Sequence, residues 1–181
     1  MRVPVKYVDS VAPIPRKLYL RKVISGGQIG VDIAAIKAAK HHGIKTGGHM
    51  PKGFQTLEGP RPGYSWMFGM RDDCPDYKTR TWANVEYADA TLRIAKDFGT
   101  RGEQCTLNAI HHFHKPNLDV YFEGHWRSGD DIQYMLTPYD VAEWIVCNNI
   151  RILNVAGNAN LSLGVSVYHY LVQVFNILLW E

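Results

Sequence analysis

The sequence of 181 residues has few cysteines and none of the cysteine pairs that bind zinc or build disulfide scaffolds. Its three cysteines, Cys74, Cys105 and Cys147, are an odd number and lie far apart, with no CxxC pair among them. This usage excludes a disulfide-rich secreted domain and a zinc ribbon. It is typical of a reducing compartment, so we expect a cytoplasmic protein.

Long apolar runs and a strong charge of one sign are also missing. No continuous run approaches the ~18 apolar residues of a membrane span, and residues 1–17 lack the apolar stretch of a signal peptide. Twenty Lys and Arg against seventeen Asp and Glu leave a net charge of +3. This excess is too small to predict nucleic-acid binding, although it favours a small anion. We therefore expect neither a membrane nor a nucleic acid as a partner.

Several familiar catalytic and metal-binding motifs are absent as well. The sequence has no GK[ST] of a Walker loop, no strict GxGxxG and no GxSxG. Among the eight histidines, His41 and His42 are adjacent and would point apart. His111 and His114 share a helical face, but no carboxylate joins them. We predict no metal site.

What the sequence does have is a regular alternation of short apolar runs and longer helical stretches, with globular proportions of 46% hydrophobic and 20% charged residues. The predicted strands are residues 20–25, 44–49, 91–95, 118–122 and 150–155, and the predicted helices are residues 31–42, 77–88, 104–114, 137–146 and 162–179. Residues 50–75, rich in Gly and Pro, are predicted to form a long loop with several aromatic side chains. This alternation indicates an α/β domain with a mostly parallel sheet and helices on both faces.

Glycines and polar side chains follow three of the predicted strands, at residues 25–32, 96–103 and 154–160. Ligands of parallel sheets bind beyond the carboxyl ends of the strands. A glycine-rich backbone before a helix also favours an anion, by about 0.3–1 kcal/mol. Each segment alone is equally explained as a tight turn, with Asp32 capping a helix and Thr106 capping or facing a ligand. Three such segments at one edge favour a ligand crevice.

The predicted helix at residues 77–88 has a polar face. Tyr77, Arg80, Thr81 and Asn84 lie on it at helical spacing. This face is either solvated or turned toward the glycine-rich segments as a wall of the binding site.

Four segments together resemble the family of putative molybdenum carriers. They are ISGGQIGVD at residues 24–32, GGHMPKG at 47–53, YKTRTWANV at 77–85 with DATL at 89–92, and LNVAGN at 153–158. The resemblance extends over nearly the whole chain from Leu20. It implies a single Rossmann-like domain at residues 20–181, after an extension of residues 1–19. It also implies a place in the LOG-like, or SLOG, superfamily, which includes cytokinin-activating phosphoribohydrolases and sensors of nucleotide signals.

The resemblance also implies a binding pocket. The residues that it assigns to this pocket are Gly26, Gly27, Gln28, Gly30, Asp32, Lys52, Gly53, Arg80, Asn84, Gly157 and Asn158. From the polar helix face and the segment after the third predicted strand we add Tyr77, Gly99, Thr100 and Thr106. Lys52, Arg80 and Arg101 would supply positive charge at the sheet edge, and Tyr64, Trp66 or Tyr77 would stack on a ring.

Two functions follow as hypotheses. The first is a non-catalytic binding protein for a small phosphorylated ligand, either molybdenum cofactor or a nucleotide-derived signal, acting as carrier, sensor or sequesterer. The second rests on Gly99-Thr100-x-x-Glu103, which resembles the GTxxE of the phosphoribohydrolases, although their preceding PGG is missing. It makes the protein a nucleotide N-glycosidase with Glu103 as its catalytic carboxylate. A third reading treats the glycine-rich segments as turns only.

The family resemblance and the apolar final helix also predict self-association. Val165, Tyr168 and Phe175 are among the apolar residues spread over much of this helix. Since one domain would have difficulty covering all of them, we expect a homo-oligomer that forms through this helix or through the aromatic loop.

Overall fold

The computed structural model describes residues 20–122 and 136–180 of the chain. The expected extension, residues 1–19, lies outside these ranges, so its boundary stays a prediction.

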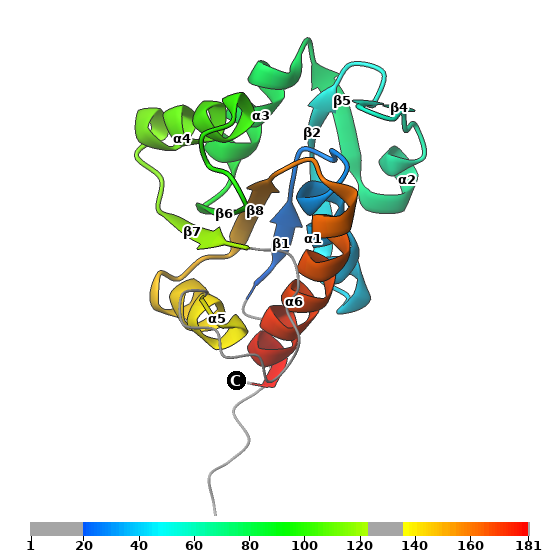
Figure 1. The fold of residues 1–181 in the computed structure, drawn as a ribbon. Helices are drawn as coiled ribbons and strands as arrows, with labels where there is room; N and C mark the ends of the chain where they lie inside the picture. The colour runs from blue at the N-terminus through cyan, green and yellow to red at the C-terminus, as the bar shows by residue number, and fades with distance from the viewer. Residues whose placement is uncertain (1–19, 123–135, 181) are drawn as a thin grey trace, which may run out of the picture.

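The described chain folds around one parallel sheet of six strands in the order β5-β2-β1-β8-β6-β7 (Figure 1). These strands are β1 (Lys22–Ile24), β2 (Lys45–Pro51), β5 (Met70–Cys74), β6 (Ala90–Ala95), β7 (Asn117–Tyr121) and β8 (Ile152–Gly157). Two short strands, β3 (Gln55–Thr56) and β4 (Gly59–Pro60), pair with each other in a separate antiparallel ribbon.

Helices cover both faces of the sheet. They are α1 (Val31–His41), α2 (Tyr64–Phe68), α3 (Tyr77–Tyr87), α4 (Arg101–Phe113), α5 (Pro138–Cys147) and α6 (Leu161–Trp180). The helices α1, α6 and α5 pack together on one face, and α3 and α4 pack together on the other (Figure 1). The prediction of one Rossmann-like α/β domain with a parallel sheet is confirmed.

Local capping sets where the helices begin. The Thr137 side chain accepts from the Asp140 N–H while the Asp140 carboxylate accepts from the Thr137 N–H, a capping box that starts α5 at Pro138. In α4 the Thr100 side chain accepts from the N–H of Glu103. Because Thr100 is the cap, α4 begins at Arg101, three residues before the predicted start.

The predicted long loop of residues 50–75 is wrong in part, because it contains the edge strand β5 and the short helix α2. The β5 sequence, MRDDC, buries only Met70 and Cys74. It carries three charged residues between them, as edge strands often do. This polar composition explains why the alternation of apolar residues did not reveal the strand.

The final helix α6 is apolar enough to need its own explanation. Residues Leu161–Leu179 have a mean hydropathy of 1.4, and by length and composition alone they could cross a membrane. We expected no such stretch. However, α6 packs along α1 and α5, and its Tyr170 and Phe175 are fully buried in the main core. A core helix of a soluble domain has this same composition, so the hydropathy is weak evidence for a membrane.

The strand order creates a topological switch point at one edge of the sheet, where a ligand can bind. From β1 the chain runs outward to β2 and β5, then crosses to β6 and β7, and finally returns with β8 between β1 and β6. The carboxyl ends of β1, β8 and β6 therefore lie side by side at a topological switch point. In open parallel sheets the ligand crevice lies at such a point.

Candidate functional site

A cleft of 460 Å³ lies at the carboxyl ends of β1, β8 and β6. Its lining residues are Gln28, Asp32, Arg80, Thr81, Thr100, Gly102, Glu103, Thr106, Ala156, Gly157, Asn158, Ala159 and Asn160. They come from all three glycine-rich strand ends and from α3 and α4. The predicted crevice is therefore present as a cavity.

The Arg80 guanidinium lies directly over the first glycine-rich turn. Its Nη1 donates to Asp32 Oδ2 at 3.2 Å, and both side chains are almost completely buried. A Cβ atom added at Gly26 would lie only 1.5 Å from Arg80 Nη1. A side chain at position 26 would therefore displace the guanidinium from its place beside Asp32. The Nε atom of Arg80 is buried and has no hydrogen-bond partner within the described chain.

The turn before α1 satisfies many of its own donors. The N–H of Gln28 donates to Asp32 Oδ2 at 3.3 Å, the N–H of Ile29 to Gln28 Oε1, and the N–H of Val31 to the Asn158 carbonyl. Burial raises the pKa of Asp32, while Arg80 and the Gln28 N–H act against that rise. A carboxylate of the protein itself thus lies where we expected a phosphate to bind.

The start of α4 is more open. Arg101 and Gly102 are its first two residues, and their N–H groups have no hydrogen-bond partner within residues 20–122 and 136–180. A Cβ atom added at Gly102 would meet nothing within 4 Å. This helix terminus therefore offers two free donors and its positive pole at the border of the cleft.

Glu103 is a second buried acid of the cleft. It is only 3% exposed, and its Oε1 accepts from Asn158 Nδ2 at 3.4 Å. Its Oε2 has no hydrogen-bond partner in the described chain and lies 4.0 Å from Arg93 Nη1. Burial raises the pKa of Glu103 to about 7, with Arg93 acting against the rise and Asp32 adding to it. This carboxyl can therefore exchange a proton near neutral pH.

Arg93 lies beneath Glu103, in the middle of the fully buried strand β6. Its guanidinium makes two hydrogen bonds to the Asp119 carboxylate on β7 and one to the Glu103 carbonyl at 3.2 Å. Phe98 lies against the guanidinium plane, with its ring centroid 4.9 Å from Cζ. Sequence reasoning missed this residue, although a charge inside the apolar run TLRIA was a visible signal.

Asn158 and Gly157 hold the cleft together. The Asn158 Oδ1 accepts from the N–H groups of Lys96 and Asp97, and its Nδ2 donates to the Asp97 carbonyl as well as to Glu103. Gly157 has no room for a side chain, since an added Cβ would lie 2.0 Å from the Ile94 carbonyl oxygen. The contacts between the end of β8 and the end of β6 thus explain both the amide side chain at position 158 and the glycine at position 157.

The structure brings together some of the residues predicted for the site and separates others. The predicted residues that line the cleft are Gln28, Asp32, Arg80, Thr100, Thr106, Gly157 and Asn158, together with Glu103, the carboxylate of the enzyme hypothesis. Gly26 lies under Arg80, and an added Cβ at Gly30 would lie 2.5 Å from the Asn160 N–H. Tyr77 is half-exposed, with its ring 5.9 Å from the Arg80 guanidinium. Thr81, Gly102, Ala156, Ala159 and Asn160 also line the cleft and were not among the predicted site residues.

Other predicted site residues do not line this cleft; they are Gly27, Lys52, Gly53, Asn84 and Gly99. Lys52 and Gly53 follow β2 and are exposed, and the Gly53 N–H donates to Asp72. Asn84 is buried and bonds to the backbone of His49 on both sides. Gly99 precedes α4, where its N–H donates to Asp97.

The charged and aromatic residues expected around the ligand are also spread out. Of the three cations, Arg80 alone lines the cleft, since Lys52 and Arg101 are exposed and are not part of its lining. Tyr64 and Trp66 belong to α2, which packs beside β5. None of the cleft-lining residues is aromatic.

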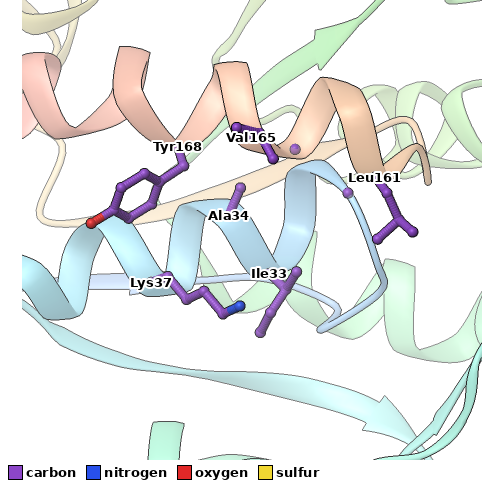
Figure 2. A pocket seen from close by; sticks show the side chains of 8 residues that line it. Ile33, Ala34, Lys37, Leu161, Val165 and Tyr168 are labelled. Carbon is purple, nitrogen blue, oxygen red and sulfur yellow. The ribbon is translucent and has the colours of Figure 1, made fainter.

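A second, smaller cavity of 320 Å³ lies between α1 and α6. Figure 2 shows Ile33, Ala34 and Lys37 of α1 facing Leu161, Val165 and Tyr168 of α6 across it. Its lining is mainly apolar, with one lysine and one tyrosine hydroxyl. The strand-end cleft, with its convergent polar groups, is the better candidate for a functional site.

Comparison with known proteins agrees with the fold and the motifs. Residues 23–179 match the model of the circularly permutated YpsA SLOG family. Among solved structures, the chain is similar to a putative molybdenum carrier protein from Syntrophus aciditrophicus. The two share 28% identity with a TM-score of 0.68, over 88% of this chain and 95% of that one. No curated protein matches the chain by sequence.

The raised pKa of Glu103 makes a prediction about stability. Its pKa rises from 4.5 to about 7 on folding, so between these values the folded state binds more protons than the unfolded state. The free energy of unfolding therefore loses up to about 3 kcal/mol at this residue as the pH rises through that range. In Glu103→Gln the side chain keeps its shape without a charge. Urea unfolding should show the variant to be more stable than the parent at pH 8 and equal to it near pH 4.

The matched control is Glu143→Gln, which removes one charge from an exposed position on α5. It should leave the difference between pH 4 and pH 8 unchanged. If Glu103→Gln is no more stable than the parent at pH 8, burial of the charged carboxylate does not lower the free energy of unfolding and the prediction is wrong.

Proposed function

Since the chain belongs to the circularly permutated YpsA SLOG family, we propose that its strand-end cleft binds a small phosphorylated ligand. In this proposal the protein is a carrier, sensor or sequesterer of that ligand. The supporting observation is the set of polar groups that border one cavity. Amide, hydroxyl and guanidinium side chains line it, and the first two N–H groups of α4, which have no partner within the described residues, lie at its border. A bound phosphate would accept hydrogen bonds from these N–H groups.

The phosphate is best accommodated at the start of α4. In the α1 turn, the N–H groups of Gln28, Ile29 and Val31 already donate within the protein. At α4 the free N–H groups of Arg101 and Gly102 add to the positive end of the helix. Such a terminus favours an anion by about 0.3–1 kcal/mol, and by up to about 2 kcal/mol when partly buried. Arg80, which also lines the cleft, would add a cation.

Polar side chains would form hydrogen bonds with the rest of the ligand. Amide and hydroxyl side chains of Gln28, Thr81, Thr106 and Asn160 line the cavity. These groups suit the ring nitrogens and hydroxyls of either a nucleotide or a pterin. The similar solved structure is that of a putative molybdenum carrier protein, which supports molybdenum cofactor as one of the two ligand classes. Native mass spectrometry of the purified protein would distinguish them by the mass of any retained molecule.

Gly102→Asp tests the position of the phosphate. A side chain at position 102 meets open space, and an acidic residue in the first turn of a helix is favourable, so the fold should be kept. Its carboxylate would instead repel an anion bound at the start of α4. In calorimetric titration with adenosine 5′-monophosphate, we expect binding to weaken by at least about 10-fold, which is about 1.4 kcal/mol.

Gly102→Asn is the matched control, because it has the same shape without the charge. It should bind the nucleotide within a few fold of the parent. Equal affinity of the aspartate and asparagine variants would place the phosphate elsewhere, and the absence of any binding of phosphorylated ligands would reject the proposed function.

A second candidate function is hydrolysis of an N-glycosidic bond. It is favoured by Glu103, a buried carboxyl whose pKa of about 7 suits proton transfer at neutral pH. In this reaction water would add to the sugar C1 carbon and the base would leave with a proton. Glu103 would stabilise the positive charge that develops on the sugar or would transfer the proton.

Incubation of the pure protein with nucleoside monophosphates distinguishes this activity from binding alone. An N-glycosidase should release free base, detectable by chromatography, and Glu103→Gln should lose that activity while keeping its fold. Recovery of the unaltered nucleotide from the parent protein would reject the enzyme and leave the binding function.

We also propose that the protein is cytoplasmic and self-associates. All three cysteines are free in the structure, which supports a reducing compartment. The domain itself buries more of α6 than expected, including Leu171, Phe175 and Leu178. The apolar surface that remains is at the start of the helix, where Leu161 is 59% and Val165 64% exposed. This is the surface through which we expect copies of the chain to meet.

Val165→Glu tests this contact. The charge would be unfavourable inside an apolar interface but is tolerated at an exposed position. Light scattering should give a multiple of 20.5 kDa for the parent and one chain for the variant. Tyr139→Glu, at an equally exposed position on α5, should keep the parental mass. A parent of one chain's mass would reject self-association.

A further inference from the structure

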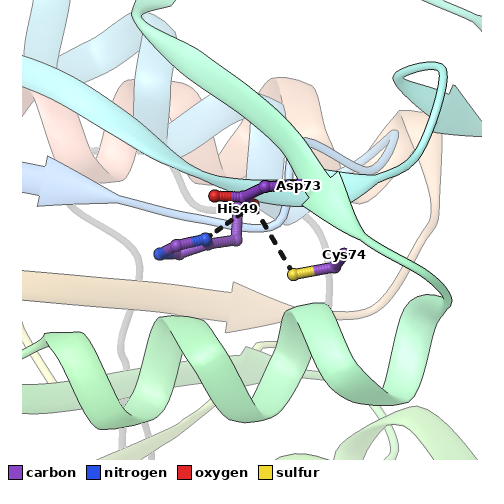
Figure 3. A group of neighbouring side chains, drawn as sticks. All are labelled: His49, Asp73 and Cys74. Carbon is purple, nitrogen blue, oxygen red and sulfur yellow. Dashed lines mark hydrogen bonds and ion pairs between the residues drawn. The ribbon is translucent and has the colours of Figure 1, made fainter.

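Three potential metal ligands lie together at the edge of the sheet, away from the residues that line the strand-end cleft. They are His49 on β2 and Asp73 and Cys74 on β5, and their donor atoms all lie within 4.8 Å of one another. Figure 3 shows the three side chains gathered between β5 and α3. His49 Nδ1 is 2.8 Å from Asp73 Oδ1, and the Cys74 thiol donates to the same oxygen at 3.6 Å.

An irregularity in the pairing of β2 with β5 brings these residues together. His49 pairs with Arg71 and Pro51 with Cys74, so three steps along β5 oppose two along β2. The additional residue on β5 is typical of a β-bulge, which changes the direction of side chains. Neighbouring residues of a regular strand would point to opposite faces, whereas here Asp73 and Cys74 both reach the same group.

Hydrogen bonds fix the backbone of two of the three residues. Asn84 of α3 is buried, and its amide accepts from the His49 N–H at 2.8 Å and donates to the His49 carbonyl at 3.1 Å. The Cys74 carbonyl accepts from the Lys52 N–H at 2.7 Å. Metal sites depend on such outer contacts to hold their ligands in place.

We propose that His49 Nδ1, Asp73 Oδ1 and Cys74 Sγ bind a zinc ion, with water as the fourth ligand. Imidazole, carboxylate and thiolate are the three protein ligands that zinc takes, and a tetrahedral ion with three of them keeps one position open. This proposal does not depend on the ligand of the strand-end cleft.

Charge and access are both suitable for such an ion. Once the thiol loses its proton, thiolate and carboxylate carry two negative charges that balance Zn²⁺. The Cys74 thiol is buried, whereas the His49 side chain is 14% and the Asp73 side chain 45% exposed, so the ion and its water would enter past His49 and Asp73. Donors in a tetrahedral zinc site lie about 3.3–3.8 Å apart, as bonds of about 2.0–2.3 Å require. The present separations reach this range with shifts of about 1 Å or less.

Proton balance follows from the present hydrogen bonds. Arg71 Nη2 lies 2.9 Å from His49 Nε2, and because a guanidinium only donates, Nε2 accepts and Nδ1 carries the ring proton. On binding zinc, the ring would stay neutral with its proton at Nε2, and the Cys74 thiol would release one proton to solvent. Arg71, whose side chain is 59% exposed, would turn outward to make room for the Nε2 proton.

Cobalt titration tests the proposal. The protein of 181 residues is treated with a chelator, desalted and titrated with Co²⁺, whose thiolate charge-transfer band and tetrahedral d–d bands report the ligands directly. We expect one equivalent to bind with both signals, and Zn²⁺ to displace it. Loss of a residue that only orients a metal ligand weakens metal binding by roughly 10–100-fold. Asp73→Asn and Cys74→Ser each remove a ligand and should therefore weaken zinc binding by more than this. Cys74→Ser should also abolish the charge-transfer band.

The matched control is Cys147→Ser, because Cys147 is an exposed cysteine on α5. It should bind cobalt and zinc as the parent does. Circular dichroism of each variant distinguishes a lost ligand from a lost fold, and Asp73→Asn, at a half-exposed position, changes the site with the least effect on packing. The absence of a thiolate band in the parent, or binding that survives both ligand substitutions, would overturn the proposal.

Discussion

The buried ion pair between Arg80 and Asp32 is the interaction on which the cleft depends. It joins α3, from one face of the sheet, to the turn that starts α1 on the other face. Removing either partner would leave the other charge buried and unpaired, which typically costs 3–5 kcal/mol, as an order of magnitude. The pair also explains Gly26, since the guanidinium packs where a side chain would be. The glycine-rich turn is therefore shaped by a residue 54 positions away in the sequence.

Charge beneath the cleft is largely balanced within the protein. Arg80 is paired with Asp32, and Arg93 is paired with Asp119. The Glu103 carboxyl also lies within 4.0 Å of the Arg93 guanidinium and interacts with its charge. The net charge of +3 consequently says little about this site. What distinguishes the cleft is the pair of free N–H donors at the start of α4, at the border of a cavity that polar side chains line. Such preorganised dipoles act at short range and are less screened by salt than exposed charges.

Much of this could be predicted from the sequence, and the exceptions have physical reasons. Apolar periodicity predicted five of the six helices and five of the six parallel strands of the described chain, and the glycine-rich strand ends predicted a crevice where the cleft lies. The edge strand β5 was missed because it has polar residues on its exposed positions. Asn84 was expected in the pocket from the family resemblance, and it shares a helix face with Arg80. Its actual partner is the backbone of His49, and a backbone group leaves no trace in a residue pattern.

Arg80 and Asn84, on one face of α3, connect this helix to the turn after β1 and to β2. Arg80 and Asn84 are one turn apart, so the same helix position that sets the guanidinium over Gly26 also sets the amide on the His49 backbone. The residue before α3, Asp76, caps the helix by accepting from the Thr79 N–H, and Cys74 lies only two residues earlier. Cys74 of the edge cluster and Arg80 of the cleft are therefore separated only by a short connection and the first turn of α3, although the cluster and the cleft share no residue.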